Sequence, residues 1–126
     1  LDKKGNNALL IASQLKHPDL VQELINLKLN VNQMNSKGLN SLEAGLGFDD
    51  EDNEILLMLL DAKVDVNSRN TLGSTALHEA VNHNLPQKIE LLLKAGADPK
   101  LKDEQGRTPA ELARIREHPA CYKALQ

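Results

Sequence analysis

The sequence predicts an all-α protein built from about four helix-turn-helix units joined by short hairpin-like loops. Four glycines, Gly5, Gly38, Gly73 and Gly106, recur at spacings of 33, 35 and 33 residues. Apolar residues make up 40% of the 126 residues and are mostly Leu and Ala, which lose little side-chain freedom in a helix. A period of this length indicates a stacked array in which each unit buries its apolar face against its neighbours.

Two positions after each glycine stands a residue suited to the N-cap of a helix: Asn7, Asn40, Thr75 and Thr108. A side-chain oxygen at this position accepts a hydrogen bond from the unpaired amides of the first helical turn. Glu43 and Glu111 stand three residues after their caps, a spacing that predicts capping boxes in the second and fourth units. A first helix is therefore predicted in each unit, over residues 8–15, 41–47, 76–83 and 109–116.

A second apolar helix is predicted after a short turn in each unit. Its apolar residues are Leu20, Val21, Leu24 and Ile25, then Ile55, Leu56, Leu59 and Leu60, then Ile89, Leu92 and Leu93, and finally Cys121, Tyr122 and Leu125. Polar connectors at 30–32, 65–67 and 98–100 lead into the next glycine turn. The chain is thus expected to be one domain, 1–126, with units at about 2–34, 35–69, 70–102 and 103–126.

Three segments carry a family resemblance: GSTALHEA at 73–80, LLLKAGAD at 91–98 and GRTP at 106–109. They resemble the ankyrin repeat, whose hallmark is Thr-Pro-Leu-His-x-Ala followed by Leu-Leu-x-x-Gly-Ala-Asp. The resemblance covers residues 2–125 and implies an ankyrin-repeat solenoid, in which antiparallel helix pairs stack side by side and hairpin fingers project at right angles. The first two units depart from the pattern at Leu10 and Glu43, which replace the usual His, and at Lys28 and Lys63, which replace the usual Gly.

Composition argues against several classes of function. The net charge is −3, and neither residues 1–87, with 7 basic and 12 acidic groups, nor residues 88–126, with 8 and 6, form the dense basic face that nucleic-acid binding requires. The longest apolar run, 55–60, is far shorter than the roughly 20 residues that span a bilayer. The single cysteine, Cys121, fits a reducing compartment, the cytoplasm or the nucleus. Because the chain begins at Leu1 without a leader, we expect a monomeric array that is part of a longer chain.

Two segments resemble metal sites without matching their geometry. HEAVNH at 78–83 is close to a zinc-protease signature, but two His five residues apart point about 140° away from each other around a helix. The acidic run at 49–54 lies in the two-residue insertion of the second unit and lacks the alternating ligands and the Gly of a calcium loop. Two other interpretations remain for this acidic run. It is either a binding site for a basic partner, or a solvated loop whose carboxylates interact favourably with the positive N-terminal end of the next helix.

No cluster of reactive residues predicts catalysis. Acid–base chemistry needs two groups at one place, and the carboxylates here are spread along the array. We therefore expect no enzyme activity, no cofactor and no metal. By resemblance, Asn32 and Asn67, each with a Leu eight residues earlier, suit an asparagine hydroxylase. The alternative is that Asn was retained there because it tolerates a left-handed backbone.

The second unit contains Gly45 and Gly47, which weaken its first helix. Either this helix ends early to admit the insertion, or flexibility presents Phe48 to a partner. Phe48 is the only Phe and lies on a predicted loop, so it is the best single candidate for an aromatic contact with a partner.

By resemblance, a partner binds the concave face made by the finger tips and the exposed side of each first helix. Leu15, Leu39, Phe48 and Leu72 are apolar where folding does not require it, and a row of such residues is typical of an interface. The alternative is a set of isolated surface residues. The candidate partner-binding residues are Leu15, Ser36, Lys37, Leu39, Phe48, Thr71, Leu72, Ser74, Asn82, His83, Glu104 and Arg107.

The sequence thus predicts a scaffold or adaptor, a protein–protein interaction module that binds a protein or peptide. The alternative is the substrate-recruiting region of a larger enzyme or ubiquitin-ligase-type assembly whose catalytic part lies outside this chain. The last unit carries the polar outer face of a terminal cap, whereas the first unit presents apolar residues 8–12. We expect an upstream repeat or another domain to cover that first edge.

Overall fold

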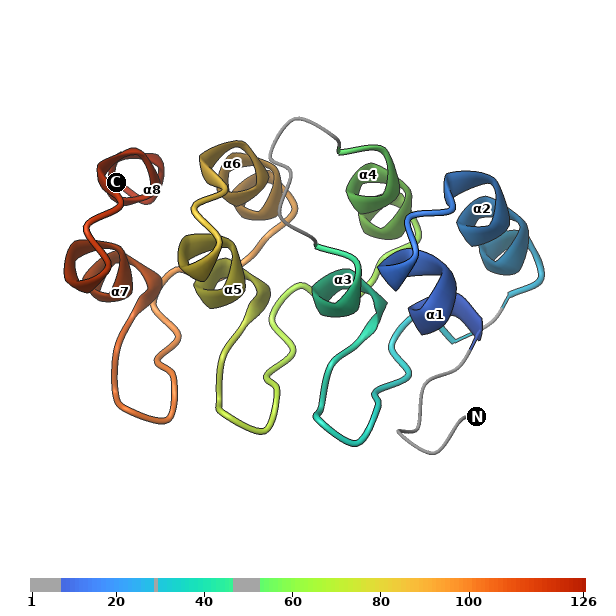
Figure 1. Ribbon diagram of the computed structural model, residues 1–126, viewed down its shortest axis with the longest axis horizontal. Helices are drawn as coiled ribbons and strands as arrows, with labels where there is room; N and C mark the ends of the chain where they lie inside the picture. Colours follow the sequence, from blue (N-terminus) through green and yellow to red (C-terminus); the bar gives the residue numbers. More distant parts are fainter. Residues whose placement is uncertain (1–7, 29, 47–52) are drawn as a thin grey trace.

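The structure is a computed structural model that describes residues 8–28, 30–46 and 53–126. The described helices are α1 Ala8–Gln14 and α2 Pro18–Asn26, α3 Ser41–Ala44 and α4 Glu54–Asp61, α5 Ala76–Asn82 and α6 Pro86–Lys94, and α7 Pro109–Ile115 and α8 Pro119–Ala124. They form antiparallel pairs that stand side by side along the long axis (Figure 1). The described residues contain no strand, so the prediction of an all-α helical array is confirmed.

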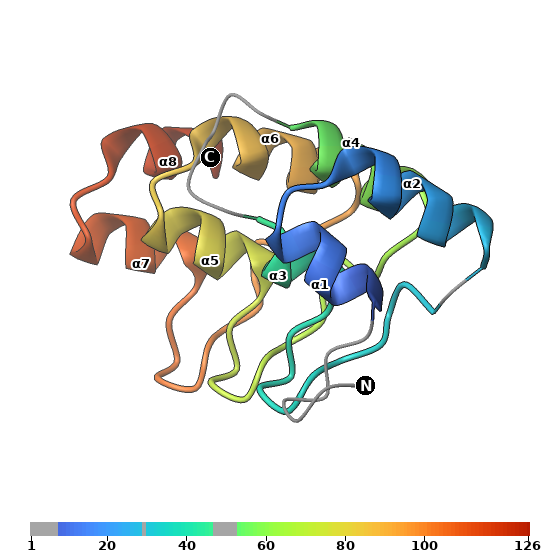
Figure 2. The ribbon, with the colours of Figure 1, turned by 45° about the vertical axis from the view of Figure 1, so that its right-hand side comes forward.

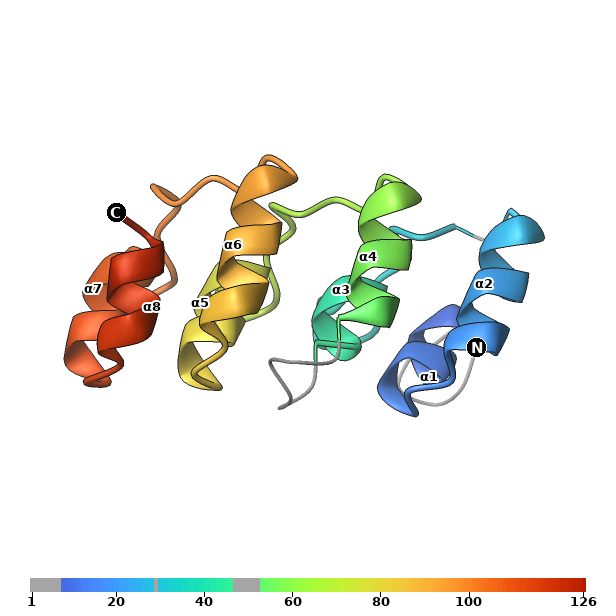
Figure 3. The ribbon, with the colours of Figure 1, turned by 90° about the horizontal axis from the view of Figure 1, so that it is seen from above.

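The pairs build two layers, which are clearest in the turned view (Figure 2). The first helices, α1, α3, α5 and α7, form one layer, and the second helices form the other (Figures 2 and 3). Long loops between the pairs project from the layer of first helices as hairpin fingers (Figure 1). The core lies between the layers, where Leu9, Leu77 and Leu92 are fully buried. Each such side chain contributes about 1.5–3 kcal/mol of burial free energy.

The predicted helix caps are confirmed wherever the structure describes them. The side chains of Asn40, Thr75 and Thr108 each accept from the amide three residues ahead. Asn7 lies outside the described residues. The second helices α2, α6 and α8 begin differently, because Pro18, Pro86 and Pro119 occupy their first position. A proline is well suited to that position, since the amide it lacks would have no partner within the helix.

Helix α3 is shorter than predicted, because it ends at Ala44 and not at residue 47. Gly45 is its C-cap, so the alternative of an early end is confirmed. A Cβ added at Gly45 would lie 2.8 Å from the Cβ of Ser13, so only glycine lets α1 and α3 approach this closely here. The Lys16 ammonium donates a hydrogen bond to the Gly45 carbonyl and closes the same contact. Phe48 and the acidic residues 49–52 lie outside the described residues.

The turns after α2, α4 and α6 each contain a left-handed residue. Lys28, Lys63 and Gly96 hold this position with φ of 61°, 66° and 98°. The first two units therefore keep the backbone of the glycine turn without the glycine. A side chain with a Cβ is strained in this conformation, so both lysines destabilise their turns.

Replacing Lys63 with Gly is expected to raise the free energy of unfolding by roughly 0.5–1 kcal/mol. Glycine removes the strain of the left-handed backbone, and this gain is partly offset because glycine loses more backbone entropy on folding. Urea unfolding followed by circular dichroism measures the change. Lys63→Ala is the matched control, because alanine removes the same long side chain but keeps the Cβ. A Gly variant no more stable than the Ala variant would contradict this account of the turn.

Candidate functional site

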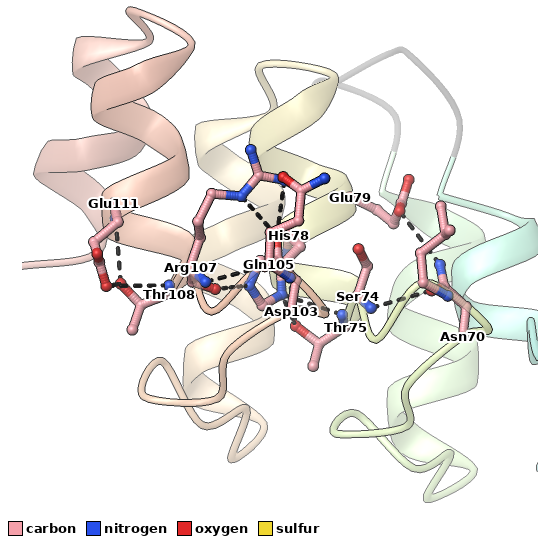
Figure 4. Close-up of polar contacts among 11 residues, drawn as sticks. Asn70, Ser74, Thr75, His78, Glu79, Asp103, Gln105, Arg107, Thr108 and Glu111 are labelled. Atoms are coloured by element: carbon pink, nitrogen blue, oxygen red, sulfur yellow. Dashed lines mark hydrogen bonds and ion pairs between the residues drawn. The ribbon is translucent and has the colours of Figure 1, made fainter.

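Each of the three fingers that the structure describes is closed by hydrogen bonds that one Asn or Asp makes with its backbone amide and its side chain. The amides of Asn35, Asn70 and Asp103 donate to the carbonyls of Leu39, Ser74 and Arg107 at 3.0, 3.0 and 2.9 Å. The side chains of the same three residues accept from two amides within their own finger. Figure 4 shows this arrangement around Asp103, Gln105 and Arg107. The tips are therefore rigid without strand pairing.

Backbone hydrogen bonds also join neighbouring fingers into a row. The Thr71 amide donates to the Lys37 carbonyl at 2.9 Å, and the Glu104 amide donates to the Leu72 carbonyl at 3.1 Å. At Gly73 an added Cβ would lie 2.8 Å from the Glu104 nitrogen, so this close approach requires glycine. The exposed tips consequently have fixed spacing along the array.

The connectors before the fingers are tied together by Asn32 and Asn67. Their Oδ1 atoms accept from the amides of Asp65 and Asp98, each at 2.7 Å. Neither Asn has a positive φ, so the interpretation that they were retained for a left-handed backbone is wrong. Their physical role is a hydrogen bond to the next unit. Hydroxylation at these residues stays a prediction.

His78 joins α5 to the next finger, and Figure 4 shows its ring between the two. Its Nδ1 accepts from the Thr75 amide at 3.2 Å, so the proton is on Nε2, which donates to the Arg107 carbonyl at 2.8 Å. Burial lowers the pKa of His78 below its ordinary value, although the bond to the Arg107 carbonyl opposes this. The ring is thus a neutral structural bridge. It completes a capping box with Thr75 that the sequence reasoning had not predicted.

Arg107 is held by Asp103 across the base of the last finger. Its Nε and Nη2 atoms both lie 3.0 Å from Asp103 Oδ2 (Figure 4). Burial alone would raise the pKa of Asp103, but hydrogen bonds from the Arg107 amide and guanidinium and from the Gln105 amide hold it below its ordinary value. The Arg107 side chain is therefore committed to an internal ion pair and is only partly exposed.

In the second helix pair, Glu43 holds the position that His78 holds in the third pair, but its side chain does not form the hydrogen bonds that His78 forms. The predicted capping box is wrong there, because only the Asn40 half forms. Both Glu43 carboxyl oxygens are buried without a hydrogen-bond partner among the described residues. Burial, with further contributions from Glu79 and Asp65, raises the pKa of Glu43 to about 8. In the fourth pair the corresponding Glu111 does form the predicted box with Thr108 (Figure 4).

The exposed side of α5 is continuous with the finger before it. The Asn70 amide group donates to Glu79 Oε1 at 3.4 Å, and His83 Nε2 lies 3.9 Å from Glu79 Oε2. Glu79 and His83 are both half-buried and are one helical turn apart. These contacts run from the finger to the end of the first helix. We call the finger tips together with this side of the first helices the finger–helix face.

Most of the described candidate residues lie at the surface. Ser36, Lys37, Thr71 and Glu104 are exposed, whereas Leu39, Asn82, His83 and Arg107 are half-buried. Ser74 is the exception, because it is 8% exposed and offers a partner almost no surface. Phe48 lies outside the described residues.

Three large apolar side chains are strongly exposed at finger or first-helix positions. Leu15, Leu72 and Ile115 are 61, 63 and 60% exposed. Ile11 is exposed as well and was not among the candidates. The repeat register could have identified it, since Ile11 and Leu15 hold the positions of Glu79 and His83 in the third pair. On α1, therefore, this side of the helix is apolar.

The described residues contain no group of three or more His, Cys, Asp or Glu side chains placed to hold a metal ion. Both ring nitrogens of His78 are hydrogen-bonded, one to Thr75 and the other to Arg107, and His83 contacts Glu79. None of the described helices has the length and apolar character needed to cross a bilayer.

Comparison with known proteins identifies the repeated unit. Two family models match the chain, described as "Ankyrin repeat" over residues 4–36 and "Ankyrin repeats (many copies)" over residues 59–113. The residues between the two matches contain the short helix α3 and the insertion.

Similar proteins come from varied organisms. A potassium channel of Oryza sativa subsp. indica is 39% identical over 83 residues, which is 66% of this chain and 9% of the channel. NF-kappa-B inhibitor alpha of Sus scrofa is 50% identical over 48 residues, 38% of this chain and 15% of that protein. B-cell lymphoma 3 protein of Homo sapiens is 45% identical over 56 residues, 44% of this chain and 12% of that protein. The chain thus spans only a small part of the relatives it matches. The helix pairs, the fingers and the two family matches agree, and the chain belongs to the ankyrin repeat family.

Proposed function

We propose that this chain is a protein–protein interaction module that binds a partner protein or peptide on its finger–helix face. Ankyrin repeats are in general modules of this kind. The observation that carries the proposal is the continuous line of contacts from Asn70 through Glu79 to His83, which makes the finger and the first helix one surface.

Two further features support this face over the second-helix layer. Backbone bonds between fingers hold the tips at fixed positions, so a partner can bind without first ordering them. Ile11 and Leu15 are exposed at successive positions on the same side of the first helix, and a contiguous apolar patch of this kind is typical of interaction sites. NF-kappa-B inhibitor alpha, one of the relatives, is named for the protein it inhibits, which fits a protein partner.

The proposal also covers the state and location of the module, which acts as a monomeric array in the cytoplasm or nucleus. The module binds neither nucleic acid nor membrane and has no catalytic centre of its own. The support is the scattered placement of carboxylates and the uneven but modest net charge of −3. The described candidate residues are Leu15, Ser36, Lys37, Leu39, Thr71, Leu72, Asn82, His83, Glu104 and Arg107, with Phe48 retained from the sequence.

The double variant Leu15→Asp with Leu72→Asp is expected to weaken partner binding at least tenfold, because it places two charges where apolar contacts form. Affinity capture with the whole chain first identifies the partner, and calorimetry then measures the dissociation constant for each variant. The matched control is Leu27→Asp with Leu57→Asp, which changes two leucines of similar exposure, 68 and 50%, near the second helices.

Circular dichroism and urea unfolding show whether both double variants keep the fold. If both fold and the Leu15 and Leu72 variant binds as well as the unchanged chain, the finger–helix face is misplaced. If the Leu27 and Leu57 variant alone loses binding, the partner occupies the second-helix layer.

A further inference from the structure

Glu43 on α3 carries a buried carboxyl that is not hydrogen-bonded. The residue is 8% exposed, and neither carboxyl oxygen has a partner among the described residues. In the third pair the same position joins two units, because His78 donates to the Arg107 carbonyl at 2.8 Å. A buried polar group without a partner is rare in proteins, so the carboxyl of Glu43 needs an explanation other than packing.

The charged groups that act on Glu43 are acidic. Burial raises the pKa of Glu43 to about 8, and the negative charges of Glu79 on α5 and Asp65 in the connector add to this effect. Helix α1 carries no charged residue, and the Lys16 ammonium that follows it is bound to the Gly45 carbonyl. Other charged side chains on the neighbouring elements are exposed, namely Lys37, Glu54, Asp61, Lys63 and Arg69. At neutral pH the carboxyl of Glu43 is therefore largely protonated.

Glu79 lies between this buried group and the solvent in its exposure. Its side chain is 25% exposed and belongs to the finger–helix face, where Oε1 accepts from the Asn70 amide group at 3.4 Å and Oε2 lies 3.9 Å from His83 Nε2 (Figure 4). A partner can thus place a cation against Glu79 without entering the core. That positive charge would offset the negative charge that acts on Glu43 and so favour the loss of its proton.

We propose that Glu79 and Glu43 form a recognition site for one cationic side chain of the partner, a lysine or an arginine, and that its binding releases a proton from Glu43. The inference rests on the proposed function, because it requires a partner on the finger–helix face. In this step the O–H bond of the Glu43 carboxyl breaks, the proton passes to the buffer, and the carboxylate that remains attracts the bound cation.

The charge of the surrounding chain fits a cationic group. Residues 1–87 hold 7 basic and 12 acidic groups, so the part of the array that contains the site is acidic. Carboxylates form their strongest hydrogen bonds with ammonium and guanidinium groups, which Glu79 can accept at the surface.

His83→Lys tests the coupling without a partner, because it places an ammonium that stays charged to about pH 10 beside Glu79. The pKa of Glu43 is measured by nuclear magnetic resonance on isotope-labelled Glu carboxyl carbons, and Glu43→Gln identifies the signal. The pKa is expected to fall by roughly one pH unit in His83→Lys. His83→Gln is the matched control, since it changes the same residue without adding a charge. Equal pKa values of Glu43 in the Lys and Gln variants would overturn the proposal.

The captured partner then tests recognition. Calorimetry at pH 7.5 in phosphate and in Tris, which differ in their heats of ionisation, counts the protons released on binding. A fall of about one unit in the pKa of Glu43 corresponds to release of about half a proton per complex. Glu43→Gln is expected to abolish this release, and Glu79→Gln is expected to weaken binding about tenfold. Glu90→Gln, at an exposed position of α6, is the matched control and is expected to change neither quantity.

These measurements separate the two possible failures. A partner that binds Leu15→Asp with Leu72→Asp as tightly as the unchanged chain contradicts the proposed function, and the recognition site then fails with it. A partner that loses affinity for that double variant, yet binds Glu79→Gln as tightly as the unchanged chain, overturns the recognition site alone. The same holds if Glu43→Gln releases as many protons as the unchanged chain.

Discussion

Replacing Glu43 with Gln is expected to raise the free energy of unfolding at pH 7 by about 3 kcal/mol. The pKa of Glu43 is raised on folding from 4.5 to about 8, so the folded chain holds a proton that the unfolded chain has lost. Stability from this group is complete below pH 4.5 and is lost as the pH rises through about 8. Glutamine keeps the shape of the protonated side chain and has no proton to lose, so it removes this dependence.

Urea unfolding of both chains at pH 5 and pH 8 measures the effect. The difference between Glu43→Gln and the unchanged chain is expected to be below about 1 kcal/mol at pH 5 and several times larger at pH 8. Glu90→Gln is the matched control, because it makes the same chemical change at an exposed position of α6. Equal pH dependence in the unchanged chain and in Glu43→Gln would rule out a buried, unpaired carboxyl at this position.

Replacing His78 with Ala is expected to lower the free energy of unfolding by about 3 kcal/mol. The change leaves the Thr75 amide and the Arg107 carbonyl without their ring contacts and opens a cavity at a completely buried side chain. Because the pKa of His78 is lowered on folding, its contribution is complete above the ordinary value of 6.5 and is lost as the pH falls below it.

His83→Ala is the matched control for this experiment, since His83 lies five residues further on and is half-buried. We expect it to change stability by no more than about 0.5 kcal/mol. Urea unfolding at pH 7 compares the two variants, and a second series at pH 5 tests the sign of the pH dependence. A loss in His78→Ala no greater than in His83→Ala would show that the ring does not join α5 to the next finger.

Glu43 and His78 show how far the repeat pattern predicts the structure. The caps at Asn40, Thr75 and Thr108 were predictable because N-cap geometry depends on a few adjacent residues. The repeat also aligns His78 with the usual His that Leu10 and Glu43 replace in the first two units. The behaviour of Glu43 was not predictable from its local spacing, because the pKa of the carboxyl is controlled by burial and by the charges of Glu79 and Asp65, which are distant in the sequence.

Tertiary contacts determine three further features that the local sequence does not predict: where α3 ends, what the Asn32 side chain binds and whether Ser74 is exposed. The end of α3 at Ala44 depends on the close approach of Gly45 to Ser13 on another helix. One of the two predicted roles of Asn32 was a left-handed turn, yet its side chain instead accepts a hydrogen bond from the Asp65 amide of the next unit. The family resemblance predicts Ser74 as a partner-binding residue of a finger, whereas the structure buries it at the base of that finger. The Gly45–Ser13 and Asn32–Asp65 contacts join residues more than 20 positions apart, beyond the range of a capping or turn motif.

Hydrogen exchange of the chain, free and bound to its captured partner, tests most directly the claim that the finger–helix face is the docking surface. The account predicts slower exchange in the complex in the fingers, at residues 36–39, 71–74 and 104–107, with little change in α2, α4, α6 and α8. Slower exchange confined to those second helices, with the fingers unchanged, would contradict it.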